Sequence, residues 1–142
     1  MAYESRHLAV HIDRPAAQVY DYAADPARLP AWASGLGDTV EQVDGRWYAE
    51  GGMGRIAIDF APRNPYGVLD HDVTLPTGEV FYNPLRVVAD EAGGAGGCEV
   101  VFTLRRQQDM SDEDYARDEA AVLADLARLK AVVEGAGGPA AA

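Results

Sequence analysis

The chain lacks most of the features that would tie it to a special environment. Among its 142 residues it has one cysteine, Cys98, so no internal disulfide can form and a reducing compartment is expected. No stretch approaches the roughly 20 consecutive apolar residues that a membrane-spanning helix needs. The N-terminus has no apolar run that could serve as a signal peptide. These absences predict a cytoplasmic protein that does not insert into membranes.

Positive charge is also scarce. The chain has 12 lysine and arginine residues against 23 aspartate and glutamate residues, and its formal net charge is −11. Such a chain is repelled by the phosphate backbone of nucleic acids and by anionic lipid surfaces. We therefore expect no nucleic-acid partner, although the charge identifies no positive partner because solubility alone explains it. The length fits one domain with a substantial core.

No cofactor and no metal site is expected. His7 and His11 share a face of the first predicted strand, but four residues of strand separate them by about 13 Å. That distance is too long for one ion with ligands near 2 Å. The acidic run at 109–114 lacks the spaced ligands and central glycine of a calcium loop. Favourable charge at a helix N-terminus explains this run better.

The last third of the chain has the pattern of one long amphipathic helix. Ser111 precedes Asp114 by three residues, which is the spacing of a capping box. Apolar side chains recur in one narrow stripe that Leu123 extends, and Glu119 falls within the same arc. The members of the stripe are Tyr115, Val122, Leu126, Leu129 and Val133. The small residues at 135–142 predict a flexible tail.

The residues before this helix predict short strands and turns. Alternating apolar and polar residues mark a strand at 7–12, and Pro15 opens the first of two short helices that end at Trp32. Six further strands are expected at 39–43, 46–50, 55–60, 69–74, 79–89 and 99–105. Pro84 interrupts the fifth of these six, which suggests a bulge or an edge. Short turns favour antiparallel neighbours, so the order predicts an α+β domain with helices on one side of a sheet.

Three segments carry a likeness to a known family. They are Ile12-Asp13-Arg14-Pro15 with Val19-Tyr20-Asp21-Tyr22, then Asp25-Pro26-Ala27-Arg28-Leu29-Pro30-Ala31-Trp32, and finally Glu99-Val100-Val101-Phe102-Thr103-Leu104 before the last helix. Over residues 3–134 the chain resembles the START/SRPBCC helix-grip superfamily, specifically its bacterial members of polyketide cyclase/dehydrase type. This resemblance implies a single ligand-binding domain, residues 1–134. In it, a seven-stranded antiparallel sheet wraps around the C-terminal helix and leaves an apolar cavity.

The resemblance is specific for the fold and vague for the function. It implies a ligand that is a lipid, a sterol, a polyketide or another apolar small molecule, and in some members it implies catalysis of cyclisation or dehydration. The motifs quoted are structural rather than catalytic. Candidate site residues must therefore come from their position in the predicted elements.

His71 is the first candidate for the cavity wall. It shares a strand face with Leu69 and Val73, so an inward face would place an imidazole in the cavity. Imidazole is the usual proton-transfer group near neutral pH. The alternative is a core histidine that is hydrogen-bonded to the backbone. Asp70 and Asp72 point the other way and are expected to be solvated.

Glu119 is the second candidate, because a carboxylate within an apolar arc must be paired, protonated or in reach of water. It could orient His71, pair with an arginine or bind a polar group of a ligand. Alternatively, the helix is only partly covered there and Glu119 reaches water. Arg86 would be a natural partner if it points inward, but Pro84 leaves the faces of Tyr82 and Arg86 undetermined.

Aromatic side chains are further candidates for the wall. Aromatic walls suit flat apolar ligands, and tyrosine hydroxyls can fix their orientation. Plain core packing is the alternative for each of them. These residues are Trp32, Phe60, Tyr82, Phe102 and Tyr115.

The sequence therefore predicts a domain that binds a small apolar or aromatic molecule between the sheet and the C-terminal helix. One alternative is an enzyme of cyclase, dehydratase or lyase type, in which His71 is the general acid–base and Glu119 or a tyrosine assists. Another is a non-catalytic interaction module with a filled core. The pattern is compatible with a homodimer, but no interface can be identified from it.

Overall fold

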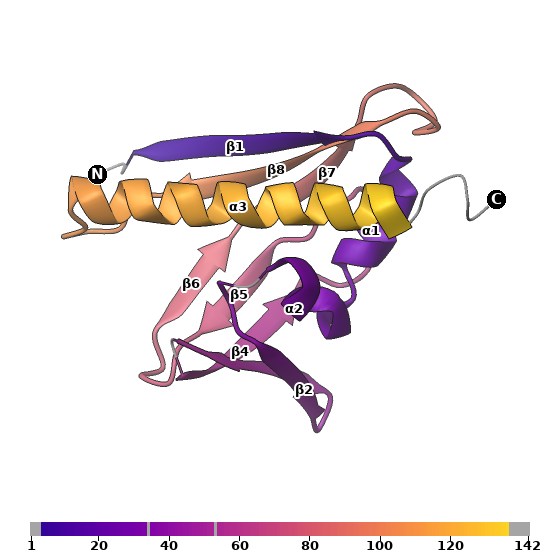
Figure 1. Ribbon diagram of the computed structural model, residues 1–142. Helices are drawn as coiled ribbons and strands as arrows, with labels where there is room; N and C mark the ends of the chain where they lie inside the picture. Colours follow the sequence, from indigo (N-terminus) through magenta and orange to yellow (C-terminus); the bar gives the residue numbers. More distant parts are fainter. Residues whose placement is uncertain (1–3, 34, 53, 137–142) are drawn as a thin grey trace.

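The computed structural model describes residues 4–33, 35–52 and 54–136 (Figure 1). Its element order confirms the predicted order of one strand, short helices, several strands and a long final helix. The elements are β1 (Ser5–Ile12), α1 (Ala16–Ala23), the 3-10 helix η1 (Pro26–Arg28), α2 (Leu29–Trp32), β2 (Thr39–Val43), β3 (Arg46–Gly51), β4 (Gly54–Phe60), β5 (His71–Thr74), β6 (Val80–Asn83), β7 (Leu85–Ala89), β8 (Cys98–Arg105) and α3 (Asp112–Ala136).

The strands form two antiparallel sheets, so the prediction of one seven-stranded sheet was wrong. Within the described residues one sheet has the order β1-β8-β7 and the other the order β2-β3-β4-β5-β6. The difference arises at Pro84, which divides the strand predicted at 79–89 into β6 and β7. Proline has no N–H to donate to a ladder, so pairing changes there. β6 pairs with β5, whereas β7 pairs with β8.

Backbone hydrogen bonds still link the two sheets across this break. The N–H of Leu69 donates to the carbonyl of Leu85 at 2.8 Å, and the N–H of Val87 donates to the carbonyl of Gly67 at 2.8 Å. Gly67 has φ +74°, and a Cβ at that position would lie 2.2 Å from the Val87 oxygen. Any other residue would therefore block this link, which bends the strands into a continuous curved surface.

Helix α3 runs alongside β1 and packs against the three-stranded sheet and α2 (Figure 1). The Oγ of Ser111 accepts a hydrogen bond from the N–H of Asp114 at 3.0 Å, as the predicted cap requires. Leu123 is 42% exposed, so the predicted extension of the apolar stripe to this residue was wrong. The helix continues to Ala136, and the rest of the predicted tail, 137–142, lies outside the described residues.

The apolar stripe of α3 is buried in the main core. Tyr115, Leu126, Leu129 and Val133 are each at most 2% exposed. Burial also raises the pKa of the Cys98 thiol to about 11, so this cysteine is an unreactive core residue.

No helix in the described part of the chain is both long enough and apolar enough to cross a membrane.

Candidate functional site

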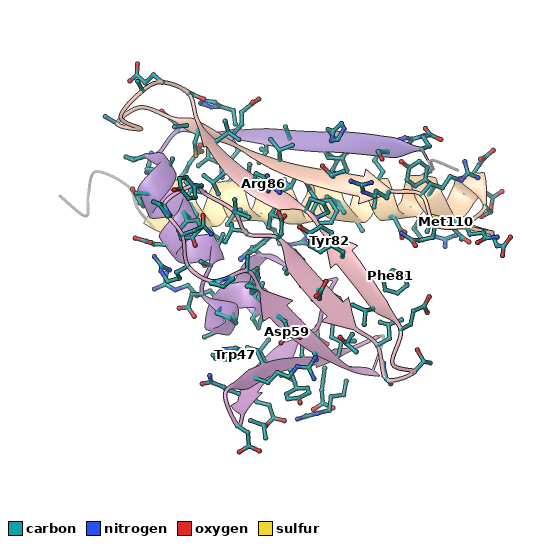
Figure 2. All side chains as sticks on the ribbon, turned by 180° about the vertical axis from the view of Figure 1, so that it is seen from behind. Trp47, Asp59, Phe81, Tyr82, Arg86 and Met110 are labelled. Atoms are coloured by element: carbon teal, nitrogen blue, oxygen red, sulfur yellow. The ribbon has the colours of Figure 1, made fainter. Side chains whose placement is uncertain are left out.

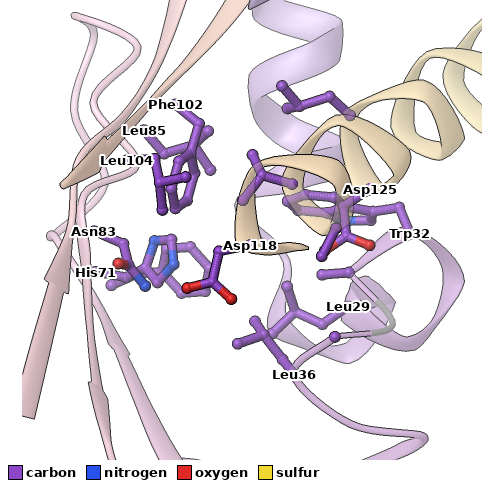
Figure 3. Close-up of a pocket in the computed structure, with 16 residues that line it drawn as sticks. Leu29, Trp32, Leu36, His71, Asn83, Leu85, Phe102, Leu104, Asp118 and Asp125 are labelled. Atoms are coloured by element: carbon purple, nitrogen blue, oxygen red, sulfur yellow. The ribbon is translucent and has the colours of Figure 1, made fainter. Parts of the chain in front are cut away.

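A pocket of about 270 Å³ lies between α3, α2 and the inner faces of the two sheets (Figure 3). Most of its wall is apolar. The apolar side chains are Leu29, Trp32, Ala33, Leu36, Phe60, Leu85, Phe102, Leu104, Ala121, Val122 and Leu126. An apolar cavity of roughly 150 Å³ holds a benzene molecule. This pocket is therefore large enough for a larger, two-ring molecule.

Four of the residues expected in the cavity wall line this pocket. Trp32 comes from α2, Phe60 from β4, His71 from β5 and Phe102 from β8. Phe60 and His71 are direct cross-strand partners, and their ring centroids lie 5.0 Å apart at an interplanar angle of 43°. Direct antiparallel partners point to the same face of a sheet, so this pairing places both rings in the pocket.

The environment of His71 fixes its tautomer. The ring is 5% exposed, and its Nδ1 lies 3.0 Å from the carbonyl oxygen of Leu69. Because a carbonyl oxygen only accepts, Nδ1–H must donate, and Nε2 of the neutral ring is then a hydrogen-bond acceptor. Burial lowers the pKa of His71 below its ordinary value, which keeps the ring neutral at pH 7. The backbone-bonded and the pocket-facing alternatives thus both describe this residue.

Trp32 brings a hydrogen-bond donor without a protein partner. Its side chain is 5% exposed, and within the described residues no acceptor lies in hydrogen-bonding range of its buried Nε1. A buried donor without an acceptor costs about 1–3 kcal/mol. The indole is part of the pocket wall, but its Nε1 has almost no accessible surface.

The sequence analysis missed the carboxylates that border the pocket. Asp118 and Asp125 line it from α3, and Asn83 lines it from β6. Figure 3 shows Asp118 pointing from the helix toward His71 and Asn83. Asp118, Val122 and Asp125 follow one another at steps of four and three residues, so they share a stripe of the helix. That spacing was the available signal.

Asp118 is exposed where it borders the pocket. Partial desolvation and the nearby Asp114 raise the pKa of its carboxyl group, and Arg117 partly offsets both effects. No hydrogen-bond donor within the described residues reaches Asp118. The carboxylate of Asp125, by contrast, forms an ion pair with Arg128.

Glu119 lies outside the pocket wall and pairs with an arginine of β1. Its carboxylate accepts a hydrogen bond from Arg6, and its side chain is 29% exposed. The expectation that Glu119 stands beside His71 or Arg86 is not met. The physical reason is that position 119 is turned about 100° from position 118, so its side chain points toward β1 rather than toward β5.

Tyr115 also lies outside the pocket wall. It is 1% exposed, and its hydroxyl donates to the carbonyl oxygen of Leu104 at 3.2 Å. The guanidinium groups of Arg6 and Arg106 lie 4.4 and 5.6 Å from its ring centroid. These contacts join the start of α3 to β1 and to the end of β8, which is a structural role.

Tyr82 and Arg86 face the side of the sheet away from α3, where Asp70 holds them (Figure 2). The Asp70 carboxylate accepts hydrogen bonds from the Leu85 N–H at 2.9 Å, from Arg86 at 2.7 and 2.8 Å, and from the Tyr82 hydroxyl. Arg86 holds the pKa of this carboxyl group far below its usual range. Asp70 is only 5% exposed, so the expectation that it is solvated was wrong.

Asp70 is buried and hydrogen-bonded because of the strand break at Pro84. The break leaves the N–H of Leu85 outside the sheet ladder, and the Asp70 carboxylate accepts its hydrogen bond instead. A buried carboxylate needs several donors, and this one has them.

No group of three or more His, Cys, Asp or Glu side chains in the described part of the chain is placed to hold a metal ion.

No protein-family model and no curated protein sequence matches the chain. Solved structures do match it. They include the di-domain aromatase/cyclase BexL of the BE-7585A biosynthetic pathway, with a TM-score of 0.68, 19% identity and coverage of 96% of this chain and 48% of BexL. They also include the Zhui aromatase/cyclase from Streptomyces sp. R1128, with a TM-score of 0.60, 19% identity and coverage of 96% and 98%. Ara h 8.0201 matches with a TM-score of 0.61, 12% identity and coverage of 94% and 99%.

The fold defines the class of protein. The chain shares the fold of these two aromatase/cyclases and of Ara h 8.0201, which is the helix-grip arrangement that the sequence resemblance implied. The chain spans about half the length of BexL and nearly the whole of Zhui. At such low identities the likeness concerns the fold and carries no information on the reaction or the ligand.

Proposed function

We propose that this domain binds a small apolar or aromatic molecule in the pocket between the sheets and α3. The observation that carries the proposal is the composition of the wall, which is mostly apolar with a few polar groups. A largely apolar concave site with a few polar groups is the usual form of a small-molecule site. The proposal takes residues 1–134 as one ligand-binding domain in the cytoplasm.

Burial of ligand surface supplies the affinity. Each Å² of apolar surface removed from water contributes about 25 cal/mol before the costs of ordering are subtracted. Phe60 and Phe102 line the pocket and can contact a flat ligand, while Nε2 of His71 offers one hydrogen-bond acceptor. An open volume of about 270 Å³ also argues against the filled core of an interaction module.

Calorimetric titration with the neutral probe 2-naphthalenemethanol tests the proposal. We expect the wild-type protein to bind this probe and Val122→Phe to bind at least tenfold more weakly, because the added ring fills the pocket. Leu123→Phe adds the same ring type at the next residue, which is exposed and outside the pocket wall, and should bind like the wild type. Equal affinities for all three proteins, or no binding by the wild type, would overturn the proposal.

One observation favours a second function, that of an enzyme that transfers protons. His71 is neutral, its Nδ1 is fixed by Leu69, and its Nε2 is left to accept a proton beside a bound molecule. Deuterium exchange of the α-protons of phenylacetone, followed by NMR, tests this function. We expect acceleration by the wild type and none by His71→Gln, with binding of 2-naphthalenemethanol retained. No acceleration by the wild type over buffer would remove this candidate.

A further inference from the structure

A second hollow lies directly beside the pocket. We call it the outer chamber; its volume is about 540 Å³, and its walls come from β5, β6, β8 and the segment that leads into α3. Four residues line both hollows: Leu36, Asn83, Leu104 and Asp118. Because the hollows share these residues, they lie side by side, and we treat them as the inner and outer parts of one site. Asp118 stands at the boundary between an apolar inner end and a more polar outer end.

The charge along this site is mainly negative. The inner pocket is lined by Asp118 and Asp125, and no lysine or arginine is among the described residues of its wall. In the outer chamber the charged side chains are Glu79, Arg105, Asp109, Asp114 and Asp118. Arg117 neutralises Asp114 at 2.9 Å, and Arg128 pairs with Asp125. Three carboxylates thus remain against one guanidinium group, and Asp118 is the one that faces both hollows.

The remaining polar and aromatic groups in the pocket wall are compatible with a positively charged ligand. His71 is neutral, and its Nε2 accepts a hydrogen bond rather than donating one. The faces of Phe60, Phe102 and Trp32 are in the same wall. Aromatic faces attract cations because the ring quadrupole is negative at the face, whereas they do not attract anions. The wall of the inner pocket is otherwise apolar, so it suits the apolar body of a ligand.

We propose that the ligand of this site is an amine, in which an apolar or aromatic body fills the inner pocket and a protonated nitrogen lies beside Asp118 at the boundary. This inference rests on the proposed function, because it needs a ligand in the inner pocket. It adds the chemical class of that ligand. A carboxylic acid with the same body would place its charge among Asp118, Asp125 and Glu79 and would be rejected.

Three probes that share one naphthalene ring test the inference. They are 2-naphthylmethylamine, which is cationic at pH 7, the neutral 2-naphthalenemethanol and the anionic 2-naphthoate. In calorimetric titrations of the full chain at low ionic strength we expect the amine to bind about fivefold more tightly than the alcohol. We expect the carboxylate to bind at least tenfold more weakly than the amine.

Variants of α3 assign the preference to one residue. Asp118→Asn should weaken binding of the amine about fivefold and leave binding of the alcohol unchanged, whereas Asp118→Glu should retain most of the preference. Glu113→Gln is the matched control, because it removes one negative charge from the same helix at an exposed position outside both hollows. It should leave the affinity for all three probes unchanged.

The outcomes separate this inference from the proposed function. If the alcohol binds but the amine binds no more tightly, the inference is overturned and the proposed function stands. The inference is also overturned if Asp118→Asn and Glu113→Gln affect the amine equally. If none of the three probes binds, the proposed function fails and the inference fails with it.

Discussion

Neighbouring positions on the inward side of α3 differ in what they do for the protein. Tyr115, Leu129 and Val133 are buried in the core. Val122, which belongs to the same apolar stripe, and Asp118 border the pocket. One helix thus provides both tight packing and a site wall. Position 118 can carry a polar group because a pocket, rather than a strand, lies opposite it.

Polar contacts fix the side of α3 that faces β1 to that strand and to the turn that follows it. Glu119 pairs with Arg6 near the start of α3, and the ammonium group of Lys130 donates to the His11 carbonyl oxygen at 2.8 Å near its end. The Asp13 N–H donates to Glu134 at 2.9 Å. These contacts hold the helix in place along its length, so the pocket on the other side keeps its width.

The largest expected effect separates the core positions of α3 from its pocket positions by stability. Leu129→Ala removes a residue that is 0% exposed, so we expect the free energy of unfolding to fall by about 2–5 kcal/mol. Val122→Ala, at a half-buried position beside the pocket, should cost less than about 1 kcal/mol, because the lost contacts face an existing hollow. Urea denaturation measures both. Equal losses would mean that the pocket wall is packed as tightly as the core.

The two sides of the sheet also differ, because one borders the pocket and the other carries the hydrogen bonds to Asp70. The next largest expected effect tests how much these hydrogen bonds stabilise the fold. Asp70→Asn leaves several donors around a neutral amide, so we expect a loss of about 1–3 kcal/mol in the free energy of unfolding. Asp59→Asn is the control, because Asp59 forms an exposed ion pair with Arg46 and should matter much less. A loss from Asp59→Asn as large as that from Asp70→Asn would contradict the role given to the strand break.

Titration of His71 and Asp118 should give stability changes of opposite sign across the pocket. The pKa of His71 is lowered in the folded chain, so below about pH 6.5 the unfolded chain binds a proton that the folded chain does not, and stability falls. The pKa of Asp118 is raised, so its contribution to stability increases as the pH falls. For one group the slope is at most about 1.4 kcal/mol per pH unit.

Urea denaturation at pH 7 and at pH 5.5 measures this effect. Between these values we expect the wild type to lose more stability than His71→Gln, which has no histidine to protonate at this position. If both proteins lose the same amount, His71 is not the buried neutral group described here.

The smallest expected effect on stability comes from neighbouring carboxylates on the two sides of α3. Glu119→Gln breaks the pair with Arg6 and should lower stability slightly without changing ligand affinity. Asp118→Asn removes a poorly solvated charge and should leave stability unchanged or slightly higher. Thermal unfolding of the two variants, compared with their affinity for 2-naphthylmethylamine, checks this difference. The same pattern for both variants would mean that the two residues share one environment.

Local patterns predicted the elements well. The strand at 7–12 and the cap at Ser111 depend on neighbouring residues, so the sequence was enough to place them. The strand break at Pro84 was visible as an interruption. That it separates two sheets was not visible, because the result depends on which distant strands pair with each half.

The site was predicted in part for a similar reason. Strand alternation made Phe60 and His71 candidates for the wall, and the structure pairs them across β4 and β5. Helical periodicity gives the angle of each side chain about the axis of α3, but not which arc meets a strand and which meets a hollow. Glu119 was therefore chosen where Asp118 faces the pocket. Asp70 was expected to be solvated because its donors, Leu85 and Arg86, come from a different strand.

The most direct test of the central claim is an NMR titration of the isotope-labelled chain with 2-naphthalenemethanol, following each backbone amide. The account predicts that shifts concentrate at Phe60, His71, Phe102 and Val122 and are weak at Arg46 and Leu123. Unchanged spectra, or shifts spread over the outer face of the sheet, would contradict the claim that the space beside α3 receives a ligand.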